Sequence, residues 1–315
     1  MKYHLAADGG GTKLIGIVYD DDMRVIRKER TGGTNVLFRP RDDAEREMDE
    51  FLDRLLEGIP ALEDANLCLV GSQEHMRKAL SERISVGKIR FYSESEVGLA
   101  SSFLKEGAVA LSGTGSFGSY FAEGKRYYVG GWGSLLGDEG SGYDVGLRVI
   151  RAAIYSSDGR GRKTLLEELV KERFSVVELW DLVTLLGTDK EVRHSISSCA
   201  MLCAKAAERG DEVAIGIYKE AGKTLALHVR CAVEKAGVLD GYPVLIMGSV
   251  WRGSPAMLES FKSEVKTFAP GAEVIVPAYE PVAGAAICGA MADGIDTEEL
   301  KRRCKGGFAS LEYRL

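Results

Sequence analysis

Residues 111–143 read LSGTGSFGSYFAEGKRYYVGGWGSLLGDEGSGY and carry two glycine clusters, Gly113–Ser116 and Gly130–Gly133. The segment between the clusters is typical of a β-hairpin. Glycine has no Cβ, so it adopts positive φ and leaves its backbone N–H uncovered, which suits sharp bends and close approach to a ligand. Two such clusters in one short stretch indicate a bound anion.

The end of this stretch, residues 137–142, reads GDEGSG and precedes a helix expected from about Tyr143. Acidic residues at a helix N-terminus cap it and interact favourably with its dipole, and this is one interpretation of Asp138 and Glu139. The other interpretation makes Asp138 an acceptor for substrate hydroxyls in a cleft walled by exposed backbone. The residues alone leave both interpretations open.

A second glycine-rich turn lies near the N-terminus, where DGGGTK (residues 8–13) joins two short apolar runs. Apolar runs on both sides of such a turn indicate a hairpin. The turn offers uncovered N–H groups, the Thr12 hydroxyl, the Lys13 cation and Asp8, a carboxylate able to hold Mg²⁺ through water. It is not a Walker loop, because GxxxxGK[ST] is absent and the turn joins strand to strand. We therefore expect it to bind phosphate.

Length and charge limit the class of protein. A chain of 315 residues suggests about two domains. The net charge of −6, with both signs interspersed, argues against nucleic acid or an anionic membrane as the main partner. No apolar run reaches the length of a membrane span, and no signal-peptide core precedes the first glycines. We therefore expect a cytoplasmic protein.

The six cysteines contain no CxxC pair, and most lie among apolar residues. This pattern is typical of small core side chains in a reducing compartment rather than of a disulfide framework. Cys199 and Cys203 are four residues apart and would share one helix face, so a metal or cluster ligand pair is the alternative. Free cysteine is more commonly just buried.

Between the two glycine-rich turns, apolar runs at 67–70 and 89–92 flank a charged helical segment. Strands that alternate with helices predict parallel strands added to the opening hairpin, and thus an α/β fold. SESE (residues 93–96) follows the second run, just before a helix. Glu94 and Glu96 are either first-turn acids that favour the helix dipole or carboxylates placed to take a proton from an attacking hydroxyl.

The order of these motifs carries a resemblance. DGGGTK, a Thr-Asn loop at 34–35, SGTGS, GGWGSLLGDEGSGY and a late Gly-Ser at 248–249 together resemble the N-acetylglucosamine kinase and BadF/BadG/BcrA/BcrD ATPase family, within the actin, sugar kinase and heat-shock chaperone superfamily. The resemblance extends from Asp8 to about Gly289. It implies two ribonuclease-H-like lobes that close over ATP and Mg²⁺ in an interdomain cleft. The first lobe would span 1–107, completed by 297–315, and the second 108–296.

The resemblance also implies roles for single residues. The Asp8 carboxylate would orient the metal, and the sugar would be held by Asn35, Asp138 and the backbone of Gly131. Nucleotide contacts are implied for Gly9, Gly10, Gly11, Thr12, Lys13, Gly113, Thr114, Gly115, Ser116, Gly248 and Ser249.

The catalytic base departs from the family pattern. In that family it is usually an aspartate in an Asn-Asp-Ala or Thr-Asp-Ala sequence, and here the register places Ser93-Glu94-Ser95 at that position. Glu94 is therefore the implied base, favoured over Glu96. Because glutamate is one methylene longer, the geometry of proton transfer would have to differ.

The function implied is an ATP-dependent kinase that phosphorylates a hydroxyl of an amino sugar such as N-acetylglucosamine or glucosamine. Two alternatives are an ATPase that activates a reductase or dehydratase, and a sugar- or nucleotide-sensing protein without turnover. Activators of the first kind carry cysteines near their subunit contact, and this chain has no convincing pair. Relatives often pair through the second lobe, so a homodimer is an expectation that the sequence leaves open.

Overall fold

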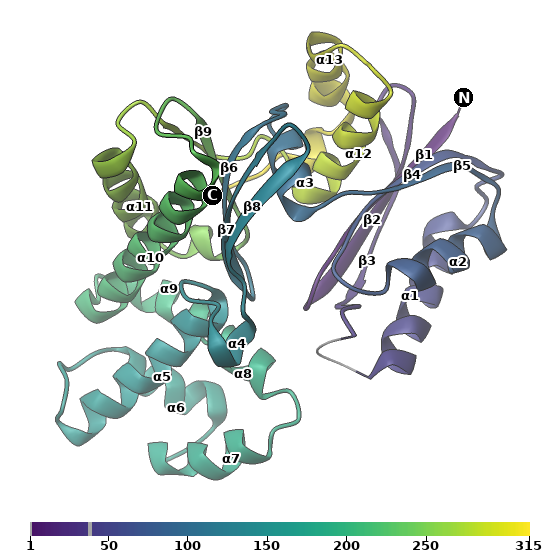
Figure 1. Ribbon diagram of the computed structural model, residues 1–315. Coiled ribbons are helices and arrows are strands. Elements are labelled where there is room, and N and C mark those ends of the chain that lie inside the picture. Colours follow the sequence, from purple (N-terminus) through teal and green to yellow (C-terminus); the bar gives the residue numbers. More distant parts are fainter. Residues whose placement is uncertain (1, 37–39) are drawn as a thin grey trace. The chain divides into compact units, whose positions relative to one another are not determined.

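The computed structural model describes residues 2–36 and 40–315. The chain divides into two compact units, one of residues 1–106 with 277–314 and the other of residues 107–276 (Figure 1). Each unit contains a mixed five-stranded sheet with helices packed against it. Among the helices of the described residues, none is both long enough and apolar enough to cross a membrane.

The sheet of the first unit has the strand order β3-β2-β1-β4-β5. The first three strands form an antiparallel meander, and β4 and β5 continue parallel to β1. The strands are β1 (Tyr3–Gly9), β2 (Lys13–Asp20), β3 (Val25–Gly32), β4 (Leu62–Leu69) and β5 (Val86–Phe91). The helices are α1 (Arg41–Leu56), α2 (Gln73–Arg83), α3 (Glu94–Ala100), α12 (Pro281–Ala292) and α13 (Thr297–Gly307), with a 3₁₀ turn η3 (Ala309–Leu311).

Alternation along β1 and β2 separates two apolar layers, because successive side chains of a strand point to opposite faces. Leu5 and Ala7 pack with Leu14, Val18 and the apolar sides of α1 and α2. The residues of β1 and β2 that point the other way, such as Ala6 and Ile17, pack with α12 and α13 on the opposite face of the sheet. Both faces of this sheet are therefore covered by helices, as Figure 1 shows.

Helix α12 belongs to the first unit, whereas the sequence placed residues 277–296 in the second lobe. Its small residues allow it to pack closely on two neighbours. A Cβ at Gly284 would collide with the Val97 carbonyl of α3, and one at Gly289 would collide with the side chain of Asn66 on β4. The helix is apolar almost all round, so its sequence signals burial without indicating which sheet covers it.

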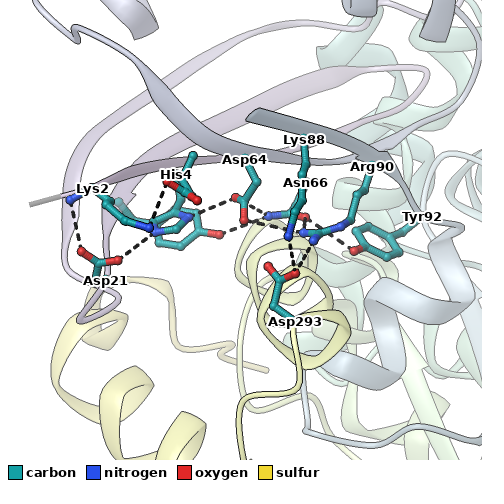
Figure 2. Close-up of polar contacts among 11 residues, drawn as sticks. Lys2, His4, Asp21, Asp64, Asn66, Lys88, Arg90, Tyr92 and Asp293 are labelled. Atoms are coloured by element: carbon teal, nitrogen blue, oxygen red, sulfur yellow. Dashed lines mark hydrogen bonds and ion pairs between the residues drawn. The ribbon is translucent and has the colours of Figure 1, made fainter. Parts of the chain in front are cut away.

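A polar cluster lies where β1, β4 and β5 meet the end of α12 (Figure 2). Asp64, which is almost fully buried, contacts His4 at 3.1 Å and Arg90 at 3.6 Å. Arg90 also pairs with Asp293, just after α12, and Lys88 lies 3.0 Å from the same carboxylate. These groups satisfy one another, as buried polar side chains in folded proteins generally do.

The sheet of the second unit has the order β10-β9-β6-β7-β8, in which β6, β7 and β8 form an antiparallel meander and β9 and β10 run parallel to β6. The strands are β6 (Gly107–Ser112), β7 (Ser116–Ala122), β8 (Lys125–Gly130), β9 (Pro243–Met247) and β10 (Glu273–Ile275). The helices are α4 (Gly133–Leu136), α5 (Gly142–Asp158), α6 (Leu166–Phe174), α7 (Leu182–Thr188), α8 (Val192–Ser198), α9 (Ala200–Glu208), α10 (Glu212–Ala236) and α11 (Pro255–Phe268), with 3₁₀ turns η1 (Leu179–Asp181) and η2 (Val250–Gly253).

The long helix α10 organises this unit. Asp211 caps it by accepting hydrogen bonds from the backbone N–H groups of Val213 and Ala214, and Gly237 ends it with a φ of 73°. The helix packs across the meander so closely that a Cβ at Gly118 on β7 would lie 2.5 Å from the backbone of His228.

Candidate functional site

The first glycine-rich turn connects β1 to β2, at one end of the strands of the first unit's sheet. It is tight, because the N–H of Gly10 donates to the carbonyl of Lys13 at 3.0 Å. Gly33, after β3, packs against the turn so closely that a Cβ there would collide with the Gly11 carbonyl, whereas nothing lies within 4 Å of a Cβ position at Gly10. The turn is thus supported on one side and leaves the Gly10 side uncovered.

Asp8 lies just before this turn, beside Cys68 on the parallel strand β4. Burial raises the pKa of Asp8 to about 6, while the charge of Lys13 and a hydrogen bond with Cys68 oppose that rise. Burial also raises the pKa of the Cys68 thiol, and the charges of Asp8 and Glu94 add to the effect. The fold therefore brings Asp8, Lys13 and Glu94 into one electrostatic neighbourhood.

The start of α3 separates the roles of the two glutamates. Ser93 is the N-cap, and Glu96 accepts hydrogen bonds from the Ser93 N–H at 2.8 Å and from its hydroxyl at 2.6 Å. This reciprocal arrangement is a capping box, so Glu96 is used to hold the helix end. Glu94 occupies the first position of the helix outside that box. Its role as the base stays a prediction.

Asn35 lies at the same end of the first unit as the turn. It is buried, and its side-chain oxygen is 3.3 Å from a Cβ position at Gly71. The Ser72 hydroxyl donates to the Thr34 carbonyl at 3.0 Å, which ties this loop to the segment that follows β4. The Thr-Asn loop and the first turn therefore gather at one end of the sheet.

In the second unit, the two glycine-rich motifs form one hydrogen-bonded structure. The hydroxyls of Ser112 and Ser116, on either side of the turn between β6 and β7, donate to the carbonyls of Gly140 and Glu139 at 2.6 and 2.7 Å. The N–H of Gly142 also donates to the carbonyl of Gly113 at 2.8 Å. SGTGS and GDEGSG thus support each other across the start of α5.

Asp138 sits at the centre of this structure, almost fully buried and with a φ of 60°. The N–H of Ser116 donates to Oδ1 at 3.4 Å, and Arg193 Nη2 donates to Oδ2 at 3.2 Å. A Cβ at Gly115 would lie 3.0 Å from Oδ1, so the carboxylate packs directly on the second turn. A non-glycine residue in the left-handed region is strained, and such strain clusters at functional sites.

Glu139 faces a different partner. His228 Nε2 on α10 lies 3.8 Å from its carboxylate, and the same ring lies 3.1 Å from a Cβ position at Gly130. Burial lowers the pKa of His228, and the charge of Glu139 partly opposes this. The adjacent Gly131, predicted to offer its backbone to the sugar, has a φ of 70° and lies against Tyr128.

Gly248 and Ser249 follow β9 at the same end of this sheet. Gly248 has a φ of 99°, and a Cβ there would collide with the Ser112 carbonyl. Ser249 is the N-cap of η2, and the far end of η2 borders, with α9, a cavity of about 510 Å³. The cavity is lined by Met201, Ala204, Lys205, Ala207, Glu208, Arg252, Gly253, Ser254 and Pro255. Trp251 instead packs in the core against Phe261, with its N–H on the Met247 carbonyl.

Four residues near these loops were not predicted from the sequence. Cys68 and Glu280 act on Asp8, and Arg193 and His228 contact the acidic turn. Glu280 directly precedes Pro281 at the start of α12, and an acid at such a helix start is a signal that could have identified it. Arg193 and His228 lie on helices of ordinary composition, and no local signal separates them from other surface or core residues.

Cys199 and Cys203 are packing residues. Both are fully buried, and their thiols face the backbone carbonyls of Ser195 and Ala214. Within residues 2–36 and 40–315, no group of three His, Cys, Asp or Glu side chains is arranged to hold a metal. The alternative of a cysteine ligand pair therefore finds no support in the structure.

Comparison with known proteins decides the family. The sequence profile of the BadF/BadG/BcrA/BcrD ATPase family matches residues 7–289. The chain belongs to this family. An N-acetylmuramic acid/N-acetylglucosamine kinase from Clostridium acetobutylicum is 30% identical over 303 residues, which covers 91% of this chain and 98% of that protein. An N-acetyl-D-glucosamine kinase from Dictyostelium discoideum is 23% identical and covers 90% of this chain and 96% of its own length.

Solved structures show the same fold for this family member. A candidate N-acetylglucosamine kinase from Porphyromonas gingivalis has a TM-score of 0.72 at 16% identity, covering 94% of this chain and all of that one. A ROK family glucokinase from Streptomyces griseus, solved with glucose and an ATP analogue, has a TM-score of 0.54 at 13% identity, covering 92% and 99%. The α/β fold is thus the actin-like sugar kinase fold, as the sequence predicted.

Proposed function

We propose that this ATPase-family member is an ATP-dependent kinase that transfers a phosphoryl group to a hydroxyl of an amino sugar such as N-acetylglucosamine or glucosamine. The observation that carries the proposal is similarity along nearly the whole chain to the amino-sugar kinase from C. acetobutylicum. The glycine-rich turns and the acidic turn all lie within the matched residues 7–289.

The chain's part in the reaction is to position the reactants and to stabilise charge. Phosphoryl transfer needs little covalent chemistry from the protein, and backbone N–H groups and cations aimed at phosphate oxygens supply most of the catalysis. The N–H groups of Gly9, Gly10, Gly11 and Thr12 and the Lys13 ammonium would bind phosphate in the first unit. Gly113, Thr114, Gly115 and Ser116 would do so in the second, and Gly248 and Ser249 would contact the nucleoside.

Asp8 fits a role beside Mg²⁺. With a pKa of about 6, its carboxylate is mostly ionised at neutral pH, and Lys13 lies near enough to influence it. The chemistry that Mg²⁺ would supply there is neutralisation of phosphate charge. Asp8 would orient that ion through water, which suits a site where the described residues form no three-ligand cage.

Glu94 would accept the proton of the attacking hydroxyl. The capping box supports this choice, because it occupies Glu96 and not Glu94. Asn35, Asp138 and the backbone of Gly131 would hold the sugar hydroxyls. Hydrogen bonds from buried groups give such a pocket its specificity, since a substrate that leaves one unpaired loses affinity.

The activator alternative is not favoured. Five of the six cysteines are buried and the sixth, Cys231, is half-buried. A cluster shared between subunits requires accessible cysteine ligands at the subunit contact, and no pair among the residues that the structure describes offers them.

A coupled assay of ADP release, run on a panel of sugars, tests the proposal. We expect ADP formation that depends on glucosamine, N-acetylglucosamine or N-acetylmuramic acid, and we expect Asp138→Asn to raise the KM for the sugar more than the KM for ATP. If every amino sugar and hexose leaves ATP intact, the kinase proposal fails.

A further inference from the structure

The acidic turn of the second unit is held by an ion pair that joins distant parts of the sequence. Arg193 Nη2 on α8 donates to Asp138 Oδ2 at 3.2 Å. The Asp138 side chain is only 4% exposed and that of Arg193 19%, so water screens the pair weakly. Such a pair differs from the surface ion pairs on the other helices, which contribute little.

The neighbouring charges do not substitute for Arg193. The Glu139 carboxylate faces His228 on α10, and Asp144 on α5 binds Arg148 and the N–H of Gly140. Asp138 itself receives the Ser116 N–H from the second turn and the guanidinium from α8. Among the ion pairs of the described residues, Arg193 provides the cation that contacts the Asp138 carboxylate.

The position of Arg193 is fixed by the packing of α8. A Cβ at Gly146 on α5 would collide with the Ile196 carbonyl, so the two helices touch backbone to backbone. Arg173 on α6 donates to the Ser198 hydroxyl at 3.1 Å, but this is an exposed contact at the far end of α8. The guanidinium is therefore presented to Asp138 by a rigid element rather than by a mobile loop.

Removing the guanidinium would leave Asp138 buried without its charge partner. An unpaired buried charge is costly, so the side chain would be expected to turn toward other donors or toward solvent. The hydrogen bond from the Ser116 N–H to Oδ1 would then be the remaining contact given for this carboxylate. Its oxygens would no longer be held in one place for sugar hydroxyls.

We propose that Arg193 is a positioning residue for sugar binding, which holds the Asp138 carboxylate through Oδ2 while the second turn contacts Oδ1. The inference rests on the proposed function, since Asp138 is the residue proposed to contact the sugar. Arg193 acts through Asp138 and does not itself touch the substrate.

The test compares Arg193→Gln and Arg193→Lys with the matched control Arg173→Gln, which removes an arginine with an exposed contact on the same helix that does not involve Asp138. Sugar affinity is measured by calorimetry and the KM for ATP by ADP release. We expect Arg193→Gln to weaken sugar binding about 10- to 100-fold, as expected when a buried partner is left unpaired. The Lys variant should recover part of this loss, and the control should match the wild type.

Two further readouts separate positioning from general damage. In Arg193→Gln, the KM for the sugar should rise while kcat at saturating sugar stays close to that of the wild type, because the residue acts on binding. In an Asp138→Asn background, Arg193→Gln should have little further effect, because coupled residues are not additive.

The outcomes distinguish the two proposals. If the wild type turns over amino sugars and Arg193→Gln leaves sugar affinity unchanged, or weakens ATP and sugar equally, the role of Arg193 is refuted and the kinase function stands. A loss confined to N-acetylmuramic acid, the sugar that carries a carboxylate, would indicate direct substrate contact and also refute the positioning role. If the wild type binds no amino sugar, both proposals fail.

Discussion

Asp8 combines burial with a proposed role that requires negative charge. Burial raises its pKa to about 6, and the charge of Lys13 limits the rise. The protonated form cannot orient a cation, so the side chain is suited to its role only above that pH. This conflict between burial and charge is typical of functional sites.

We therefore predict that kcat/KM for ATP falls as the pH is lowered through about 6, by about tenfold per pH unit below it. The expected sign follows from the carboxylate being the active form. Asp8→Asn should lower kcat/KM about 10- to 100-fold at neutral pH, the range typical of groups that orient a metal through its outer shell. It should also remove this limb of the pH profile. A limb that persists unchanged in Asp8→Asn would assign the titration to another group.

Glu94 and Glu96 are two residues apart and are expected to differ completely in effect. Glu94→Gln should lower kcat about 10²- to 10⁴-fold with little change in the KM for the sugar, because a general base acts in the transition state. Glu96→Ala should leave kcat nearly intact and lower the free energy of unfolding by about 1 kcal/mol, the usual cost of a lost cap. Steady-state kinetics and denaturant unfolding measure the two effects. The reverse pattern would move the base to Glu96.

At the scale of elements, the polar cluster of Figure 2 connects the strands of the first unit to α12. Burial lowers the pKa of His4, but its contacts with Asp64 and Asp21 together raise it by more. The net pKa therefore lies above the ordinary value of 6.5. Asp293 is affected in the opposite direction, because Lys88 and Arg90 hold its pKa down against the effect of burial. The cluster thus favours protonated histidine in the folded state.

A raised histidine pKa makes stability depend on pH with a definite sign. The contribution of His4 is fully present below pH 6.5, the unfolded value, and is lost as the pH rises through the folded pKa. We predict that the free energy of unfolding falls over this range in the wild type and that His4→Gln flattens the fall. Denaturant titrations at several pH values measure it. An equal slope in both proteins would contradict the assigned role of His4.

Local sequence patterns predicted turns and strands better than they predicted contacts between residues far apart in the sequence. The two glycine-rich turns and the hairpins at residues 8–13 and 113–133 were all predicted from local pattern. Arg193 was not, because its meeting with Asp138 spans 55 residues and depends on how α8 packs on α5. The spacing of Ser93 and Glu96 matches the capping-box signature and could have identified Glu96 as the capping glutamate, although both glutamates occur in the same acidic run.

At the scale of the whole molecule, two units of the sugar kinase fold were predicted, and their first boundary lies at 106/107, beside the expected 107/108. The second boundary lies at 276/277 instead of 296/297. The error came from α12, whose uniformly small, apolar residues fit either sheet. What fixes its place is close packing at Gly284 and Gly289, which only the assembled fold defines.

In the proposed reaction, the γ-phosphoryl group of ATP passes to a sugar and not to water. Phosphorus NMR of the reaction products, with N-acetylglucosamine and glucosamine as acceptors, distinguishes the two. We expect a phosphomonoester signal that grows in proportion to ADP. ADP accompanied only by inorganic phosphate would contradict it and would identify the protein as an ATPase.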